Sequence, residues 1–263
     1  MRLIMNDSGN DNYLLTPGPL TTSLATKQAM LRDWGSRDTD FIAITRRIQD
    51  RLLNIARVAD SHVAVPVQGS GTFGVEATLG TLIAPGQRTL VLENGAYGKR
   101  IVTILERIGH QVSVLRWPED QQVDPTALDA ALREDAAIEH VVVVHCETTT
   151  GILNDMVAIG RVTKAHKRRL IIDGMSAFGA IPIDGDSVPF DALIASSNKC
   201  FEGVPGIAFA LIARQWLELA EGNAHSLALD LYEQWRGLEA NGQWRFTPPT
   251  HVLAAFDQAL AAH

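Results

Sequence analysis

The chain has 263 residues, of which 46% are hydrophobic and 20% charged, and its formal net charge at pH 7 is −7. This length can bury a substantial core in one large α/β domain or in two smaller ones. The acidic balance argues against a nucleic-acid partner, because binding to phosphates needs a concentrated positive surface. The one dense basic run, residues 164–169, falls where a helix is expected to end, and there the helix dipole favours cations.

Cysteine usage and hydropathy point to the cytoplasm. The two cysteines, Cys146 and Cys200, make neither a CxxC motif nor a cysteine–histidine spacing typical of a metal site. The N-terminus turns polar too early for a signal peptide, and no apolar run is long enough to span a bilayer. We therefore expect a cytoplasmic protein with no bound metal and no membrane partner.

Strands and helices are predicted to alternate along most of the chain. Residues 13–20 form a stiff, proline-rich turn, and helical patterns follow over about 22–32 and 40–57. Apolar runs then predict strands at 62–67, 88–92, 111–115, 141–145, 170–172, 192–196 and 207–212, with helices near 74–83, 99–108, 125–133 and 156–166. After residue 212 the pattern is helical, apart from a proline-rich break at 247–250.

This order of elements defines the expected fold class. Strands that are apolar throughout and separated by helices indicate an α/β fold with a mainly parallel, seven-stranded sheet and helices on both faces. Such sheets bind ligands at the carboxyl ends of their strands. Candidate functional residues are therefore expected just after each strand.

The turn after the first predicted strand is rich in glycine, serine and threonine. Residues 67–77 read Val-Gln-Gly-Ser-Gly-Thr-Phe-Gly-Val-Glu-Ala, and such a turn at the start of a helix offers backbone N–H groups to a phosphate. Gly69, Gly71 and Gly74 also match the dinucleotide fingerprint GxGxxG, with Glu93 at about the spacing of a ribose-binding acid. This segment alone leaves three interpretations open: a cup for a cofactor phosphate, a dinucleotide site, or a tight turn with no ligand.

Two further strand ends carry a carboxylate and an amine. Asp173 ends an apolar strand and is followed by small residues, which fits either a ligand for a bound molecule or a helix N-cap. Lys199 follows another apolar strand and precedes a glycine-containing loop, whereas the other lysines lie on expected helices or in the basic run. A buried amine without a firm counter-charge has a lowered pKa and can act as a nucleophile, although a lone lysine more often forms a salt bridge.

The combination of these three features distinguishes between the interpretations. Pyridoxal phosphate (PLP) needs a phosphate cup, a carboxylate that keeps its ring nitrogen protonated, and a lysine for its aldehyde. Residues 70–72, Asp173 and Lys199 supply them in that order, whereas a dinucleotide-dependent dehydrogenase explains only the first. The sequence therefore predicts a PLP enzyme in which Lys199 holds the cofactor as a Schiff base.

Motifs along nearly the whole chain resemble the class V aminotransferases, which have the PLP-dependent transferase fold type I. The matching stretches are 14–22 (Leu-Leu-Thr-Pro-Gly-Pro-Leu-Thr-Thr), 68–72, 94–98, 145–151 (His-Cys-Glu-Thr-Thr-Thr-Gly), 173–176, 197–200 (Ser-Asn-Lys-Cys), 203–206, 226–232 and 244–251 (Trp-Arg-Phe-Thr-Pro-Pro-Thr-His). The first and last stretches, with residues 147–151, resemble in particular the 2-aminoethylphosphonate–pyruvate transaminases of that family.

The resemblance implies roles for the matching residues in cofactor binding. Ser70, Gly71 and Thr72 would hold the cofactor phosphate. Tyr97 would stack on the pyridine ring, although by itself it fits a half-buried packing tyrosine. Thr148 would hydrogen-bond the ring hydroxyl, and its alternative is a plain turn threonine.

The resemblance also implies a homodimer with active sites at the interface. Thr247 would reach the phosphate of the neighbouring subunit's cofactor, and its alternative is a helix N-cap before Pro248. Asp173 would keep the cofactor ring protonated, and Lys199 would act as general base and acid. The implied reaction converts 2-aminoethylphosphonate and pyruvate to phosphonoacetaldehyde and L-alanine. The alternatives are another class V activity, such as alanine–glyoxylate transfer or a lyase reaction, and a catalytically silent PLP-binding remnant.

The length of the chain departs from the pattern of that family. Its members normally continue into a small C-terminal α/β domain with the arginine that pairs with the substrate's phosphonate or carboxylate. This chain ends at His263, inside the helix expected to lead into that domain, and Arg37 is the one speculative replacement. We therefore expect an N-terminal arm over residues 1–20, a PLP-binding large domain over residues 21–263 and no C-terminal small domain.

Overall fold

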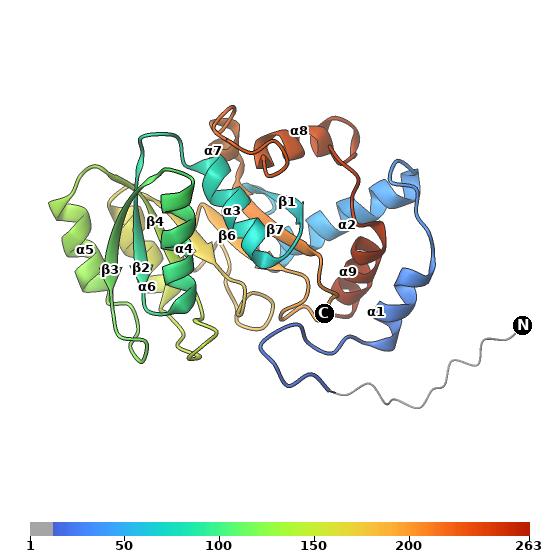
Figure 1. Ribbon diagram of the computed structural model, residues 1–263, viewed down its shortest axis with the longest axis horizontal. Coiled ribbons are helices and arrows are strands. Elements are labelled where there is room, and N and C mark those ends of the chain that lie inside the picture. The colour runs from blue at the N-terminus through green and yellow to red at the C-terminus, as the bar shows by residue number, and fades with distance from the viewer. Residues whose placement is uncertain (1–12) are drawn as a thin grey trace, which may run out of the picture.

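A seven-stranded sheet organises the molecule, as a computed structural model of residues 13–263 shows (Figure 1). The strands are β1 (His62–Gln68), β2 (Arg88–Glu93), β3 (Gln111–Arg116), β4 (Ile138–Val144), β5 (Arg169–Asp173), β6 (Ala192–Ser196) and β7 (Ile207–Ala213). Their order across the sheet is β1-β7-β6-β5-β4-β2-β3, and β7 runs antiparallel to both of its neighbours while the other pairs are parallel. The predicted strands and the mainly parallel sheet are confirmed.

Helices cover both faces of this sheet. They are α1 (Leu24–Gln28) with the short 3-10 helix η1 (Ala29–Leu31), α2 (Thr39–Ile55), α3 (Gly71–Leu82), α4 (Ala96–Arg107), α5 (Pro125–Glu134), α6 (Met156–Ala165), α7 (Arg214–Glu218), α8 (Leu231–Asn241) and α9 (Thr250–Ala262). One face carries α3, α4, α7 and α8, and the other carries α2, α5, α6 and α9. In Figure 1, α3 and α4 lie in front of the sheet, and α1, α2 and α9 gather at its β1 end.

Alternation along the central strands builds the two cores. In β4, Val141 and Val143 pack into the core on the α2 face, while Val142 and Val144 pack into the core on the α3 face. All four are at most 3% exposed. Because a strand buried on both sides has no solvent face, its sequence is apolar throughout, which is the pattern that predicted the strand.

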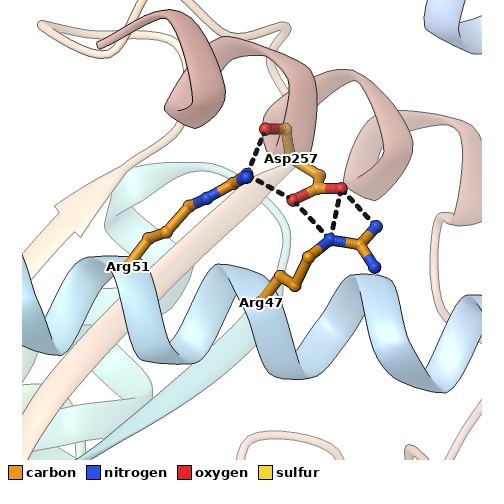
Figure 2. A network of polar contacts seen from close by, with 3 residues as sticks. All are labelled: Arg47, Arg51 and Asp257. Carbon is orange, nitrogen blue, oxygen red and sulfur yellow. Dashed lines mark hydrogen bonds and ion pairs between the residues drawn. The ribbon is translucent and has the colours of Figure 1, made fainter.

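Two arginines and one aspartate join α2 to α9 (Figure 2). Asp257 Oδ2 accepts hydrogen bonds from Nε and a terminal nitrogen of Arg47 at 3.1 and 2.6 Å. Arg51 donates to Oδ1 of the same carboxylate at 2.6 Å and to its backbone carbonyl at 2.8 Å. Bidentate pairing of this kind fixes the two helices in direction as well as in distance.

The N-terminal turn and the hydropathy of the helices complete the description. Residues 13–20 form the expected turn, while the first twelve residues of the predicted N-terminal arm lie outside the described residues. Within residues 13–263, no helix is long and apolar enough to cross a membrane.

Candidate active site

A cavity of about 460 Å³ opens at the carboxyl ends of β1, β5 and β6 and the amino end of β7. Six residues predicted for the cofactor site line it, namely Ser70, Gly71, Thr72, Tyr97, Asp173 and Lys199. Segments more than a hundred residues apart meet here because parallel strands deliver their ends to the same edge of a sheet.

The predicted phosphate cup is formed by the start of α3. Ser70 is the N-cap residue, and its backbone carbonyl accepts hydrogen bonds from the N–H groups of Phe73 and Gly74. Gly71 leaves room for Met175, because a Cβ there would lie 2.6 Å from Sδ of that side chain. The N–H groups at the start of a helix and its positive dipole end favour an anion.

The residues of the alternative dinucleotide fingerprint have other roles. Gly74 allows α3 to approach the sheet, since a Cβ on it would lie 2.7 Å from Cβ of Ala208. Glu93, the expected ribose ligand, does not line the cavity, and its carboxylate pairs with Nε of Arg116 at 3.3 Å. The geometry gives the dinucleotide interpretation no support.

Asp173 is a buried carboxylate in the cavity wall. Burial raises its pKa to about 6, and the nearby charge of Glu147 adds to the rise. The backbone N–H of Met175, which donates to Asp173 Oδ1 at 3.0 Å, opposes this shift, as do the positive charges of Arg100 and Lys199. A run of turns follows Asp173, so its alternative as a helix N-cap is wrong.

Lys199 lies on the turn after β6 and is half-buried. The turn is fixed by Ser197, whose hydroxyl donates to the backbone carbonyls of Val204 and Ile207 at 2.6 and 3.2 Å. Within residues 13–263, no carboxylate lies within ion-pair distance of the ammonium group of Lys199. The alternative of a salt bridge therefore has no support among these residues. The amine is therefore available to a ligand in the cavity.

Tyr97 and Thr148 lie differently with respect to the cavity. Tyr97, in the first turn of α4, lines it, and the guanidinium carbon of Arg100 lies 4.6 Å from the centre of its ring. Thr148 is not in the lining, and its hydroxyl makes a 2.5 Å hydrogen bond with that of Ser176. That bond ties the loop after β4 to the turn after Asp173.

Thr247 lies away from this cavity. It lines a second one, of about 330 Å³, together with Ser36, Arg37, Arg245 and other residues of 243–248. Helix α9 begins at Thr250 with Pro249 as its N-cap residue, so the alternative of Thr247 as a helix N-cap is wrong. The expected role at a neighbouring subunit's cofactor stays a prediction.

Several site residues were missed by sequence reasoning. Arg100, Met175, Asn198 and Pro205 also line the cavity. Arg100 could have been found, because it lies three residues after Tyr97 and so shares its helix face. Met175 and Pro205 could not have been found, since an apolar residue in a loop is as common in ordinary packing as in a binding site.

The comparisons with known proteins decide the family. Residues 23–261 match the family described as Aminotransferase class-V. The chain belongs to the class V aminotransferases. A 2-aminoethylphosphonate–pyruvate transaminase of Polaromonas sp. is 54% identical over 256 residues, which cover 96% of this chain and 68% of the relative. Another, from Burkholderia lata, is 54% identical over 250 residues, covering 95% of this chain and 66% of the relative.

The fold of this aminotransferase is shared with solved structures. A subgroup IV aspartate aminotransferase of Thermus thermophilus matches with a TM-score of 0.87 at 24% identity, covering 95% of this chain and 70% of that one. The expected fold type I large domain is thereby confirmed. The chain spans about two thirds of the length of the curated relatives that it matches.

Proposed function

We propose that this aminotransferase uses PLP to transfer the amino group of 2-aminoethylphosphonate to pyruvate, giving phosphonoacetaldehyde and L-alanine. The observation that carries the proposal is that the α3 phosphate cup, the buried Asp173 and Lys199 meet in one cavity, and that Lys199 has no ion-pair partner within residues 13–263. The similarity to two transaminases of this substrate, at 54% identity each, supports the choice of amine donor.

The residues in the cavity fit the cofactor. Ser70, Gly71 and Thr72 would bind its phosphate, and Asp173 would accept a hydrogen bond from its protonated ring nitrogen. Lys199 would bind its aldehyde. The hydroxyl of Ser196, a buried lining residue, has no hydrogen-bond partner among the described residues and can serve a bound group.

Two more residues would hold the cofactor ring. Tyr97 would pack its flat face on the pyridine. Thr148 would hydrogen-bond the ring hydroxyl. The hydroxyl of Ser176, which is hydrogen-bonded to that of Thr148, would assist it.

The chemistry divides between cofactor and chain. When bound, PLP supplies an electron sink for the charge left on the substrate carbon. With the cofactor bound, Lys199 would take up a proton at its Nζ from the substrate and give it back, as a general base and acid. Asp173 is a strong hydrogen-bond acceptor because burial has raised its pKa, and the apolar side chains of Val75, Ile101 and Ile104 limit water in the cavity.

We further propose a cytoplasmic homodimer in which Thr247 of each subunit reaches the partner's cofactor phosphate. The clustering of Thr247 with Arg37 and Arg245 in the second cavity supports an anion-binding role for that surface. Two free cysteines fit a reducing compartment. In this proposal residues 1–20 form an arm and residues 21–263 the PLP-binding domain.

The test is a coupled assay on the purified chain with PLP, 2-aminoethylphosphonate and pyruvate. The proposal predicts stoichiometric L-alanine and phosphonoacetaldehyde and a shift of the cofactor's absorbance on adding the amine alone. Lys199→Ala should produce neither. Turnover of other amines but not of 2-aminoethylphosphonate would establish another class V activity, and cofactor binding without any turnover would establish a silent remnant.

A further inference from the structure

We propose that Glu147, which lies outside the cavity lining, is a positioning residue that holds Tyr97 in place and puts a second negative charge near Asp173. The inference deepens the proposed function and rests on it, because these are the residues proposed to hold the cofactor ring. Glu147 lies on the loop after β4 and its side chain is fully buried, at 0% exposure.

The carboxylate of Glu147 caps α4 from another segment of the chain. Its Oε2 accepts a hydrogen bond from the backbone N–H of Tyr97 at 3.1 Å, and its Oε1 accepts one from Gly98 at 2.8 Å. The N-cap residue of α4 is Gly95, which has no side chain to do this. A carboxylate at this position satisfies two free N–H groups and matches the helix dipole, so it fixes the first turn, which carries Tyr97.

Gly95 makes room for this contact. A Cβ built on it would lie 2.6 Å from the carboxyl carbon of Glu147 and 2.8 Å from Oε2. The backbone of Gly95 is extended, so the need for glycine comes from the approach of Glu147 and not from its own conformation. Glu147 and Gly95 therefore form a matched pair.

The loop that carries Glu147 is itself held firmly. The backbone N–H of Glu147 donates to the carbonyl of Ile152 at 3.0 Å, and its carbonyl accepts a hydrogen bond from the N–H of Gly151 at 2.7 Å. Beside it, Asn94 and Asn154 donate to one another's side-chain oxygens at 2.9 and 3.2 Å and so tie the loop before α4 to the loop after β4. Hydrogen bonds thus hold both the loop that carries Glu147 and the loop that leads into α4.

Glu147 also acts on Asp173 through its charge. Burial is the main cause of the raised pKa of Asp173, and the charge of Glu147 raises it further, while Arg100 and Lys199 lower it. The adjacent His145 does not add a charge, because burial lowers its pKa to about 4. Loss of the charge on Glu147 should therefore lower the pKa of Asp173 and weaken its hold on a proton shared with the cofactor nitrogen.

Three variants separate the two effects. Glu147→Gln keeps the size but removes the charge and one acceptor. Glu147→Asp keeps the charge but is too short to reach both N–H groups. Gly95→Ala keeps the charge and displaces the carboxylate from the cap. Glu93→Gln is the matched control, because it removes another buried carboxylate that lies beside Gly98 but, within residues 13–263, accepts its hydrogen bond from Arg116 and none from α4.

The first measurement is hydrogen exchange of the start of α4 in the chain without cofactor. Amides 97 and 98 should exchange about tenfold faster in all three variants than in Glu93→Gln, while exchange in the central strands stays unchanged. Equal exchange in the variants and the control would overturn the cap. This measurement does not depend on transamination, so it separates failure of this inference from failure of the proposed function.

The second measurement is the pH dependence of the bound cofactor's absorbance and of kcat. Glu147→Gln should lower kcat about tenfold or more and move the acidic limb to lower pH, because the pKa of Asp173 falls. Glu147→Asp should lower kcat without moving that limb. A limb that stays in place in Glu147→Gln, with kcat equal to the control, would overturn the charge effect.

Discussion

A Cβ atom on Gly18 would lie 2.3 Å from Cδ of Lys199 and 2.8 Å from its Nζ. The backbone of the N-terminal turn therefore lies directly against the proposed cofactor lysine. The backbone N–H of Leu20 donates to the carbonyl of Asn198, the residue before that lysine, at 3.3 Å, which holds the turn in this place. Gly18 and Leu20 of the N-terminal turn thus contact the segment that carries the proposed cofactor lysine.

Gly18→Ala should impair the site. Gly18 has a φ of +147°, a conformation that disfavours a side chain, and the added methyl would collide with Lys199. We expect a tenfold or greater loss of PLP affinity with little change in the unfolding temperature, measured by absorbance titration and thermal melting. Gly222→Ala is the control. Gly222 also has a positive φ, of +75°, but a Cβ added to it would meet no atom within 4 Å. Unchanged PLP affinity in Gly18→Ala would refute the contact.

Removing the charge of Asp173 should stabilise the chain without cofactor while abolishing activity. The folded pKa of about 6 lies above the ordinary value of 3.8, so the carboxyl's stabilising contribution is complete below about pH 4 and is lost as the pH rises through 6. Asp173→Asn should therefore raise the free energy of unfolding by about 1–3 kcal/mol at pH 8. Urea denaturation should show this difference vanish near pH 4. An Asp173→Asn variant that is less stable than the wild type at pH 8 would contradict the raised pKa of Asp173.

The contact of Asp257 with Arg47 and Arg51 should contribute measurably to stability (Figure 2). Asp257 is 15% exposed and the arginine side chains are 48% and 35% exposed, so solvent screens part of the attraction. Asp257→Ala should lower the free energy of unfolding by about 1–2 kcal/mol. Glu239→Ala, which breaks a longer and more exposed pair with Arg214, should cost about 0.5 kcal/mol or less. Equal losses of free energy in Asp257→Ala and Glu239→Ala would show that the contact of Asp257 with the two arginines contributes no more than an exposed ion pair.

The role of Thr247 at a partner's site is testable by mixing subunits. Lys199→Ala and Thr247→Ala chains should each be weak or inactive as homodimers. If Thr247 serves the partner's cofactor, each mixed dimer has one intact site and one doubly altered site. Random mixing should then restore about a quarter of the wild-type activity. Mixtures no more active than the sum of the separate variants would show that Thr247 does not act across an interface.

The sequence pattern predicted the central strands well because they are buried on both faces, so that β4 and β7 are apolar almost throughout. In β3, Gln111 and Ser113 interrupt the apolar run, and its residues are only partly buried or exposed. The predicted start of α3 is three residues late, since Gly71, Thr72 and Phe73 have no helical apolar pattern. These residues nevertheless form the first turn of the helix.

The candidate site was predictable only in part. Asp173 and Lys199 could be found because ionisable residues after apolar strands are rare, and residues 70–72 because such a turn has a known electrostatic use. The role of Glu147 could not be found, since its partners are backbone N–H groups about 50 residues away. It follows an apolar strand within the matching stretch 145–151, but nothing along the chain indicates that it caps a helix.

Borohydride reduction of the PLP-loaded chain, followed by peptide mapping, tests the central claim most directly. Reduction fixes the cofactor to the amine that holds it. We predict one pyridoxyl adduct, on Lys199, and none in Lys199→Ala treated in the same way. An adduct on another lysine, or no adduct in a chain that has taken up PLP, would contradict the assignment of Lys199.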